Sequence, residues 1–296
     1  MLKNNLPGVA IFAFNRPNHL KKTLKSLSQN LNAKNYDIFI FCDGPKSISD
    51  KKKIKEVRKI SKNYLSFKSK KYFFRKSNFG LYNSLKYGIS KVLKTKQSVI
   101  VLEDDIITNK YFLDYMSKTL NFFYNQKNIG SVTGYSYANC DHEMFLSQRH
   151  ASWGWGTWRH VWDKMKWDKK YINKYMKKKN FKKDFNRGGN DMYQLLEEQL
   201  DGQIDTMDII FNFNCFIKNK YCVCPKSSML YNIGLDGTGI HCKKNDKVFN
   251  NFDKNFYPKI YTKLKIENNI IKKIYNSFKT PIHLRIKNKA LSWFSS

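Results

Sequence analysis

Acidic residues are scarce in this chain. Its 296 residues hold 23 Asp and Glu against 55 Lys and Arg, which gives a formal net charge of +32. Such an excess implies attraction to polyanions, a class that includes nucleic acids, anionic lipid headgroups and phosphorylated substrates. The charge alone does not choose among them, and part of it reflects the abundance of Lys, Asn and Ile that is typical of an AT-rich genome.

Long apolar runs are missing as well. No stretch of eighteen or more uncharged apolar residues occurs, which excludes a membrane-spanning helix of the usual kind. Residues 1–7 also lack the apolar core of a signal peptide. From these two absences we expect a cytoplasmic protein.

Cysteine is sparse. The six cysteines stand at positions 42, 140, 215, 222, 224 and 242. Their scatter matches neither a disulfide framework nor the paired spacing of a zinc site. Cys222 and Cys224 are two residues apart in a strand-like run, so they point to one face and are expected to be reduced thiols of the core.

The chain does contain enough apolar material for a core. Hydrophobic residues make up 41% and aromatic residues 16% of the sequence, which excludes a disordered protein. At this length one large domain or two modest ones can fold. No internal repeat is visible.

Strand-like runs alternate with helical stretches in the first half. Four strands and two helices with an apolar stripe are predicted at residues 9–14, 37–42, 71–74 and 98–102, and at 17–29 and 78–93. This alternation favours an α/β fold with a parallel sheet and crossover helices. The strands are apolar throughout, as expected when both faces of the sheet are covered.

Ligands of such sheets bind beyond the carboxyl ends of the strands. The residues that follow the four predicted strands are polar and charged: Asn15 and Arg16, Asp43 and Gly44, Arg75 to Gly80, and Glu103 to Asp105. We therefore expect the ligand site along this rim.

The composition changes after a further predicted strand at residues 130–134. Residues 150–167 hold five of the six tryptophans, and residues 164–187 carry eleven basic residues against two acids. We interpret residues 1–135 as a nucleotide-binding half and residues 136–245 as a substrate-recognising half built on the same sheet.

Residues 246–296 form a basic tail. From Lys254 onwards ten Lys or Arg accompany a single acid, interleaved with apolar and aromatic side chains. This pattern is typical of an amphipathic helix. Such a helix either lies on an anionic membrane surface or packs its apolar stripe onto the domain, and the pattern does not separate the two.

The most informative run is residues 99–105. Four apolar residues that favour a strand, at positions 99–102, are followed directly by Glu103, Asp104 and Asp105. Adjacent carboxylates repel one another, so they persist most easily where a divalent cation or a cationic ligand group lies among them. Oxygen ligands of this kind suit Mg²⁺ or Mn²⁺, which commonly bind through one or two carboxylates and substrate phosphates. The alternative is an acidic, solvated turn.

Three segments carry a resemblance to a known family. They are residues 101–105, the Trp-Gly-Trp-Gly-Thr-Trp run at 153–158, and residues 232–237 followed by His241. Over about residues 8–242 the chain resembles the GT-A glycosyltransferases, and more narrowly bacterial sugar transferases related to the N-acetylglucosaminyltransferase I type. The resemblance implies an α/β, GT-A (Rossmann-like) fold, with a mostly parallel sheet flanked by helices and followed by the basic helical tail.

The resemblance also implies roles for the acid triplet. It corresponds to the metal-binding DxD-type motif of the family, with Asp105 on Mn²⁺ or Mg²⁺, Asp104 on the ribose or the metal, and Glu103 on the donor sugar. The expected chemistry agrees, because a nucleoside diphosphate gains negative charge as the sugar departs and a divalent ion stabilises that change.

Other rim residues are expected at the nucleotide. Arg16 and Asp43 match positions near the base, and Asn15 belongs to the same group. An aspartate can accept a hydrogen bond from uracil, so a uridine donor is the first expectation, with a plain Asp-Gly turn as the alternative for Asp43. Asn78 and Gly80 open the third crossover and either offer backbone amides to the nucleotide or simply cap a helix.

An inverting transferase needs a carboxylate that takes the proton of the acceptor hydroxyl. Asp205 is the first candidate for this base and Asp208 the second, since they fall where the resemblance places it. Both have a structural alternative, because acids at a helix start cap free amides. Met207 stands where the family often has tryptophan, which leaves the choice between them open.

His241 follows a glycine-rich turn, where some GT-A enzymes hold a histidine near the metal or the diphosphate. It either serves that role or closes the loop. Trp153, Trp155 and Trp158 are candidates for stacking on a sugar ring, although aromatic side chains of this size more often build core. The glycines between them favour a loop that approaches a ligand.

The leading hypothesis is a metal-dependent, inverting hexosyl- or N-acetylhexosaminyltransferase that uses a nucleotide-sugar donor. Its acceptor would be a bacterial surface glycan such as lipopolysaccharide, lipooligosaccharide or capsule. The enzyme would bind peripherally to the anionic inner face of the plasma membrane. No nucleic-acid partner is expected. One alternative is a sugar nucleotidyltransferase, although the loop after the first strand lacks the expected glycine-rich sequence. Another is a non-catalytic polyanion-binding protein, which leaves the acid triplet unexplained.

Overall fold

The computed structural model describes residues 6–63, 67–138, 140–234, 251–261 and 264–278. The first half contains β1 (Gly8–Ala13), α1 (Pro17–Ser28), η1 (Ala33–Asn35), β2 (Asp37–Cys42), α2 (Asp50–Lys62), β3 (Ser69–Phe74), α3 (Leu81–Leu93), β4 (Ser98–Glu103), β5 (Ile106–Thr108), α4 (Phe112–Phe122) and β6 (Ile129–Thr133). The second half contains β7 (Met144–Ser147), β8 (Trp155–Trp158), α5 (Arg159–Trp162), α6 (Lys169–Met176), α7 (Phe181–Phe185), η2 (Asn186–Gly188), α8 (Met192–Leu200), α9 (Asp208–Ile217), β9 (Tyr221–Pro225), β10 (Leu230–Asn232) and α10 (Asn268–Ser277).

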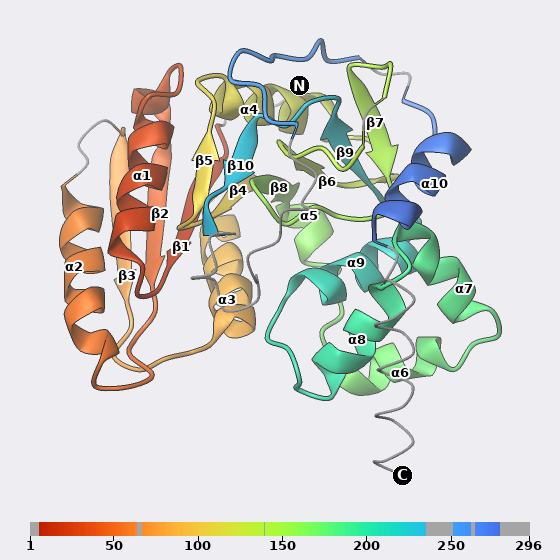
Figure 1. Cartoon of the computed structure of the whole chain (residues 1–296), viewed down its shortest axis with the longest axis horizontal. Coiled ribbons are helices and arrows are strands. Elements are labelled where there is room, and N and C mark those ends of the chain that lie inside the picture. Colours follow the sequence, from red (N-terminus) through yellow and green to blue (C-terminus); the bar gives the residue numbers. More distant parts are fainter. Residues whose placement is uncertain (1–5, 64–66, 139, 235–250, 262–263, 279–296) are drawn as a thin grey trace.

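One sheet of eight strands, in the order β3-β2-β1-β4-β8-β6-β9-β7, runs through the protein (Figure 1). β1 pairs in parallel with β2 and β4, β2 with β3, and β6 with β9. β8 and β7 run antiparallel to their neighbours, and β5 forms a separate antiparallel pair with β10. The predicted mostly parallel α/β sheet is confirmed.

The predicted strands and helices of the first half are all present. Their ends differ from prediction by a few residues, most clearly at α3, which was expected from residue 78 and begins at Leu81. The difference arises because Gly80 has a φ of 77°, outside the helical region, and ends a turn that precedes the helix.

Helices cover both faces of the sheet. The Cys42 thiol contacts the hydroxyl of Ser61 on α2 at 3.5 Å, while the ring of the preceding residue, Phe41, lies against Gly88 of α3. Successive side chains of a strand point to opposite faces, so α2 and α3 lie on opposite sides. This double cover explains why β1, β2 and β4 are apolar apart from the end residues Asp37, Ser98 and Glu103.

The helices of the second half enclose a core of their own. α6, α7, α8 and α9 gather at one end of the molecule (Figure 1) around Ile172, Phe181, Phe185, Met192, Leu196, Ile209, Ile210 and Phe213. α9 also contributes Phe211 and Cys215 to the main core against the sheet. α9 therefore joins the helical region to the sheet and fixes where its first residue, Asp208, emerges.

The tail packs onto the domain over the stretch that the structure describes. Ile270 and Ile274 of α10 are buried against Cys140, Cys222 and Cys224. The packing alternative therefore holds for residues 268–278, while residues 279–296 lie outside the described residues. The five described cysteines are free and buried, as predicted for Cys222 and Cys224.

None of the helices in the described part of the chain combines the length and the apolar character that a membrane span requires.

α1 holds the turn that follows β4. Thr23 of α1 is buried, and its hydroxyl donates a hydrogen bond of 2.8 Å to the main-chain oxygen of Asp104. This bond fixes the peptide between two of the three acids that end the strand.

Replacing Thr23 by Val preserves the shape of the side chain and removes this donor from a buried carbonyl. We expect Thr23→Val to lower the free energy of unfolding by about 1 to 3 kcal/mol, measured by urea denaturation. Thr23→Ser keeps the hydroxyl and serves as the control with a smaller loss. Equal stability of the valine and serine variants would contradict the role of this bond.

Candidate active site

An arginine lies among the three acids. β1 and β4 are paired in parallel with Phe12 opposite Glu103, so their carboxyl ends meet. Arg16 follows β1, and its guanidinium forms a short ion pair with Asp104 and a second with Asp105, 2.9 Å between Nη1 and Oδ2. Asp104 and Asp105 are only 2% and 6% exposed. The cationic group expected among the acids is thus, in part, a side chain of the protein.

The site concentrates negative charge in a buried place. Burial raises the pKa of Asp104 to about 6, with Arg16 opposing this rise. Burial also raises the pKa of Glu103 well above its usual range, and the charges of Asp105 and Asp208 add to the increase. For Arg16 burial disfavours the charged form, yet the neighbouring aspartates outweigh it and raise the arginine pKa. The three acids Glu103, Asp104 and Asp105 therefore share one guanidinium.

Asp105 has an oxygen that the described residues leave unsatisfied. Its Oδ1 is buried and has no hydrogen-bond partner among them. Such an atom is costly unless a ligand satisfies it. Within the described ranges no group of three or more His, Cys, Asp or Glu side chains is arranged to hold a metal. The unsatisfied Oδ1 of Asp105 fits an ion that is bound by one carboxylate and completed by substrate phosphates.

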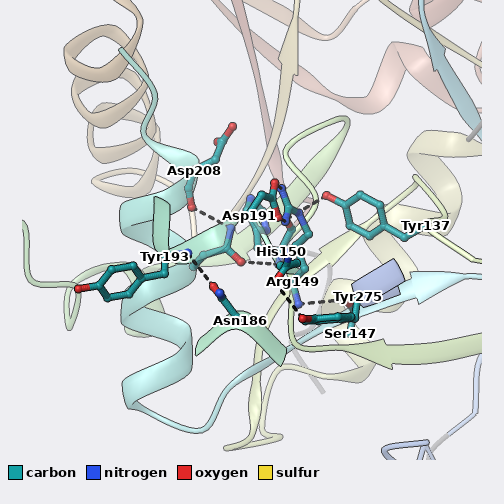
Figure 2. A network of polar contacts seen from close by, with 11 residues as sticks. Tyr137, Ser147, Arg149, His150, Asn186, Asp191, Tyr193, Asp208 and Tyr275 are labelled. Atoms are coloured by element: carbon teal, nitrogen blue, oxygen red, sulfur yellow. Dashed lines mark hydrogen bonds and ion pairs between the residues drawn. The ribbon is translucent and has the colours of Figure 1, made fainter. Parts of the chain in front are cut away.

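Asp208 lies at the start of α9, close enough to Glu103 to raise its pKa. The main-chain oxygen of Asp208 accepts a bond of 3.0 Å from the Asn212 side chain, whose Oδ1 accepts a bond of 2.7 Å from the amide of His150. In Figure 2 the carboxylate of Asp208 points away from this network, while its main-chain oxygen takes part in it. The side chain is thus presented by a firmly held backbone.

Asp205 is engaged differently. Its two oxygens accept hydrogen bonds from the amides of Leu81 and Tyr82, at 2.6 and 3.0 Å, and so cap the first turn of α3. A Cβ at Gly80 would lie 2.6 Å from Asp205 Oδ2, which explains the glycine at this position. Asp205 thus caps a helix, as the structural alternative proposed, but that helix is α3 and not α9, the helix that follows Asp205 in the sequence.

Asp43 likewise bonds to the turn before α3. Its carboxylate accepts bonds from the amides of Phe79 at 2.9 Å and Gly80 at 3.2 Å, and from that of Gly44 at 2.8 Å. The Asn78 side chain donates to the oxygen of Gly44 at 3.0 Å. The amide of Gly80, expected at the nucleotide, thus has protein partners, as the turn and cap alternatives implied.

Asn15 supports the next loop rather than standing free. Its Nδ2 donates a hydrogen bond of 2.7 Å to Oδ1 of Asp50, a buried residue at the start of α2. Asp50 also accepts bonds from the amides of Lys46 and Ser47 at 3.1 and 3.0 Å. The loop between β2 and α2 is therefore held to the end of β1.

Two of the three candidate sugar-stacking tryptophans are core residues. Trp155 and Trp158 lie in β8 and are each 1% exposed, and the Trp158 indole donates to the oxygen of Leu120. Their proposed contact with a sugar is wrong, because β8 pairs on both sides and is covered on both faces. Trp153 precedes the strand, is half-buried, and packs edge-to-face on Tyr135 with ring centroids 4.9 Å apart.

The segment that precedes His241 in the sequence contacts the acid cluster through Ile233 and Gly234. The amide of Ile233 donates a hydrogen bond of 2.9 Å to the main-chain oxygen of Asp105. A Cβ on Gly234 would lie 2.3 Å from Asp105 Oδ2 and 2.9 Å from Arg16 Nη1, so this glycine permits the close approach. His241 itself lies outside the described residues.

One partly buried ion pair was not predicted from the sequence. Arg149 binds Asp191 through two hydrogen bonds of 2.7 and 3.0 Å (Figure 2). The Arg149 guanidinium also stacks on Phe278, with 3.7 Å between the guanidinium carbon and the ring centroid. The partners are 42 residues apart, and no local pattern couples them. This pair and its stacking join β7, α8 and the end of α10 close to the backbone that carries Asp208.

The family model described as glycosyl transferase family 2 matches residues 8–193. The chain belongs to glycosyltransferase family 2. The matched segment contains Arg16 and the acid triplet and ends in α8, before Asp205 and Asp208. No curated protein gives a significant match.

Solved structures of S. aureus TarS show low similarity to this family 2 member. One matches at 9% identity and a TM-score of 0.42, over 76% of this chain and 36% of TarS. TarS 1-349, alone and in complex with UDP, matches at 10% identity and a TM-score of 0.41, over 76% of this chain and 60% of that one. The chain thus spans less than two thirds of the length of these proteins.

Removing the guanidinium leaves two buried carboxylates without their counter-charge. We expect Arg16→Met to lower the free energy of unfolding at neutral pH by about 3 kcal/mol, measured by chemical denaturation. Adding Asp104→Asn should recover part of this loss because one buried charge is removed. Lys25→Met, on the exposed side of α1, is the control and should change stability by less than about 0.5 kcal/mol. A double variant no more stable than Arg16→Met would contradict the role given to the charge.

Proposed function

We propose that this protein is a metal-dependent, inverting glycosyltransferase that transfers a hexosyl or N-acetylhexosaminyl group from a nucleotide sugar, with a UDP-sugar as the first candidate. The proposed acceptor is a bacterial surface glycan such as lipopolysaccharide, lipooligosaccharide or capsule. The observation that carries the proposal is the Oδ1 of Asp105, which is buried and unsatisfied within the described residues, just after the end of β4, where burial and the charges of Asp105 and Asp208 raise the pKa of Glu103.

Asp105 is the proposed protein ligand of Mn²⁺ or Mg²⁺. When bound, the ion would neutralise charge on the leaving nucleoside diphosphate. Asp104 and Arg16 orient this ligand, because Arg16 joins Asp104 to Asp105 in one set of ion pairs. A part in metal or diphosphate binding stays a proposal for His241.

Asp208 is the proposed general base, in preference to Asp205. The oxygens of Asp205 are taken by the amides of α3. Asp208 is close enough to Glu103 to raise its pKa, and within the described residues its carboxylate accepts one hydrogen bond, of 3.3 Å, from the hydroxyl of Thr206. A base must reach the acceptor hydroxyl, so a carboxylate engaged by two amides is poorly suited.

The transfer is proposed to be a single in-line displacement. The acceptor oxygen forms a bond to the anomeric carbon as the bond from that carbon to the diphosphate oxygen breaks, with inversion at the carbon. The hydroxyl proton passes to Asp208 and the electron pair of the broken bond leaves with the diphosphate. Glu103 is proposed to hold a hydroxyl of the transferred sugar.

Trp153 is the proposed aromatic contact of a sugar ring. Trp153 lies two residues before Trp155, which pairs with Val101 of β4, and Val101 lies two residues before Glu103. The half-buried ring of Trp153 packs edge-to-face on Tyr135.

The metal and donor can be tested by binding alone. We expect UDP to raise the melting temperature of the wild-type protein when Mn²⁺ is present, because a ligand that binds the folded state stabilises it. The increase should be lost in Asp105→Asn and retained in the control Asp141→Asn, which changes an exposed aspartate. An equal increase without Mn²⁺, or in Asp105→Asn, would argue against the proposed metal site.

The choice of base can be tested with the same substitution at both positions. Asp208→Asn should lower kcat by a factor of about 10² to 10⁴ with little change in stability. Asp205→Asn should mainly weaken the cap of α3, lowering the free energy of unfolding by about 1 kcal/mol. Donor consumption and urea denaturation measure the two effects, and the opposite assignment follows if Asp205→Asn is the inactive variant.

A further inference from the structure

A basic helix face with an exposed isoleucine lies beside the candidate active site. α2 carries Lys51, Lys52, Lys53, Lys55, Arg58, Lys59 and Lys62 against the acids Asp50 and Glu56. Asp50 is buried in the loop contacts described above, so Glu56 is the acid left to offset these charges. We call the stripe of Lys51, Lys52, Lys55 and Lys59, together with Ile48, the α2 face.

The lysines of the α2 face point to one side. Their spacing of three and four residues places them on one stripe of the helix. Lys52, Lys55 and Lys59 line a common surface pocket with Glu56 and Lys62. The opposite side of α2, with Ile54 and Val57, is buried. In Figure 1 α2 lies at the outer margin of the molecule beside β3, away from the C-terminal helices.

Ile48 is 82% exposed on a loop that is firmly held. Asp50 accepts hydrogen bonds from the amides of Lys46 and Ser47 and from the side chain of Asn15, next to Arg16. The exposure of the isoleucine is thus built into the loop. Lys46 and Lys51 flank it, and both are exposed.

A second exposed apolar side chain lies on the neighbouring loop. Phe79 is 46% exposed, and the two loops touch because the Asn78 side chain donates to the oxygen of Gly44. Arg75 stacks on the Phe79 ring with 3.5 Å between the guanidinium carbon and the ring centroid. Basic and apolar groups therefore alternate along this part of the carboxyl edge.

We propose that the α2 face is a docking surface for an anionic lipid bilayer, with Ile48 inserted among the headgroups. Lysines attract acidic lipids, and an isoleucine held outward gains by leaving water, a gain that a soluble polyanion does not offer. Docking through this loop brings the bilayer next to Asn15 and Arg16, at the rim where the acceptor of the proposed reaction would enter. The docking surface does not depend on the proposed reaction, because it concerns binding alone.

The test is sedimentation of the full chain with phosphatidylcholine vesicles, with and without phosphatidylglycerol. The wild-type protein should bind only the vesicles with phosphatidylglycerol. Replacing Lys51, Lys52 and Lys55 by Gln should lower the partition coefficient about 100-fold, because each lysine near the surface contributes about 1 kcal/mol. Ile48→Ser should lower it about tenfold.

The matched control replaces the exposed Lys177, Lys178 and Lys179 by Gln, which lowers the net charge of +32 by the same amount. It should bind nearly as the wild type does. Equal losses in the two triple variants, or no binding by the wild type, overturn the proposal. If Ile48→Ser binds like the wild type while the α2 triple variant does not, the face binds polyanions in general and the bilayer proposal fails.

Insertion is measured separately with an environment-sensitive fluorophore on Ile48→Cys. The other described cysteines are buried, and Cys242 is replaced by Ser in the same protein. The emission should shift to shorter wavelength on vesicles with phosphatidylglycerol. An unchanged spectrum of the bound protein would overturn insertion of this loop.

Discussion

The ion pairs of Arg16 with Asp104 and Asp105 are the interaction on which the candidate site depends. They place a positive charge among carboxylates whose pKa values burial raises. Without it, the end of β4 would hold buried like charges that repel one another. The same pairs leave one oxygen of Asp105 unsatisfied within the described residues. A protein side chain thus supplies the counter-charge of the acids, and one buried carboxylate oxygen is left without a partner among the described residues.

Much of this arrangement could be predicted from the sequence because it depends on short-range patterns. The apolar runs of β1, β2 and β4 and the polar residues that follow them fix both the strands and the rim. Arg16 and Asp105 were expected at one edge for that reason. Trp155 and Trp158 were misread because composition does not tell whether a tryptophan faces a ligand or the core. The pairing of β8 between β4 and β6 decides this, and no local signal announces it.

Contacts between charged residues and partners that are distant in the sequence are equally hard to predict from the sequence. Asp205 and Asp208 are close in sequence and similar in type, yet Asp205 caps α3, whereas the charge of Asp208 contributes to the raised pKa of Glu103. Arg149 and Asp191 form a bidentate pair that no spacing rule suggests. α2 shows the converse case, since its lysines are plain in the sequence while the held loop that exposes Ile48 is visible only in the structure.

The cap that Asp205 gives to α3 bears on the order in which the protein is made. The capping oxygens come from a residue 124 positions downstream of the amides they bind. During synthesis the first half of the sheet therefore emerges with the leading turn of α3 incomplete, until the segment before α9 has left the ribosome. Contacts of such long range slow folding and join distant segments into one cooperative unit. A truncated nascent chain that ends before Asp205 would accordingly contain an α3 whose first amides, those of Leu81 and Tyr82, lack this cap.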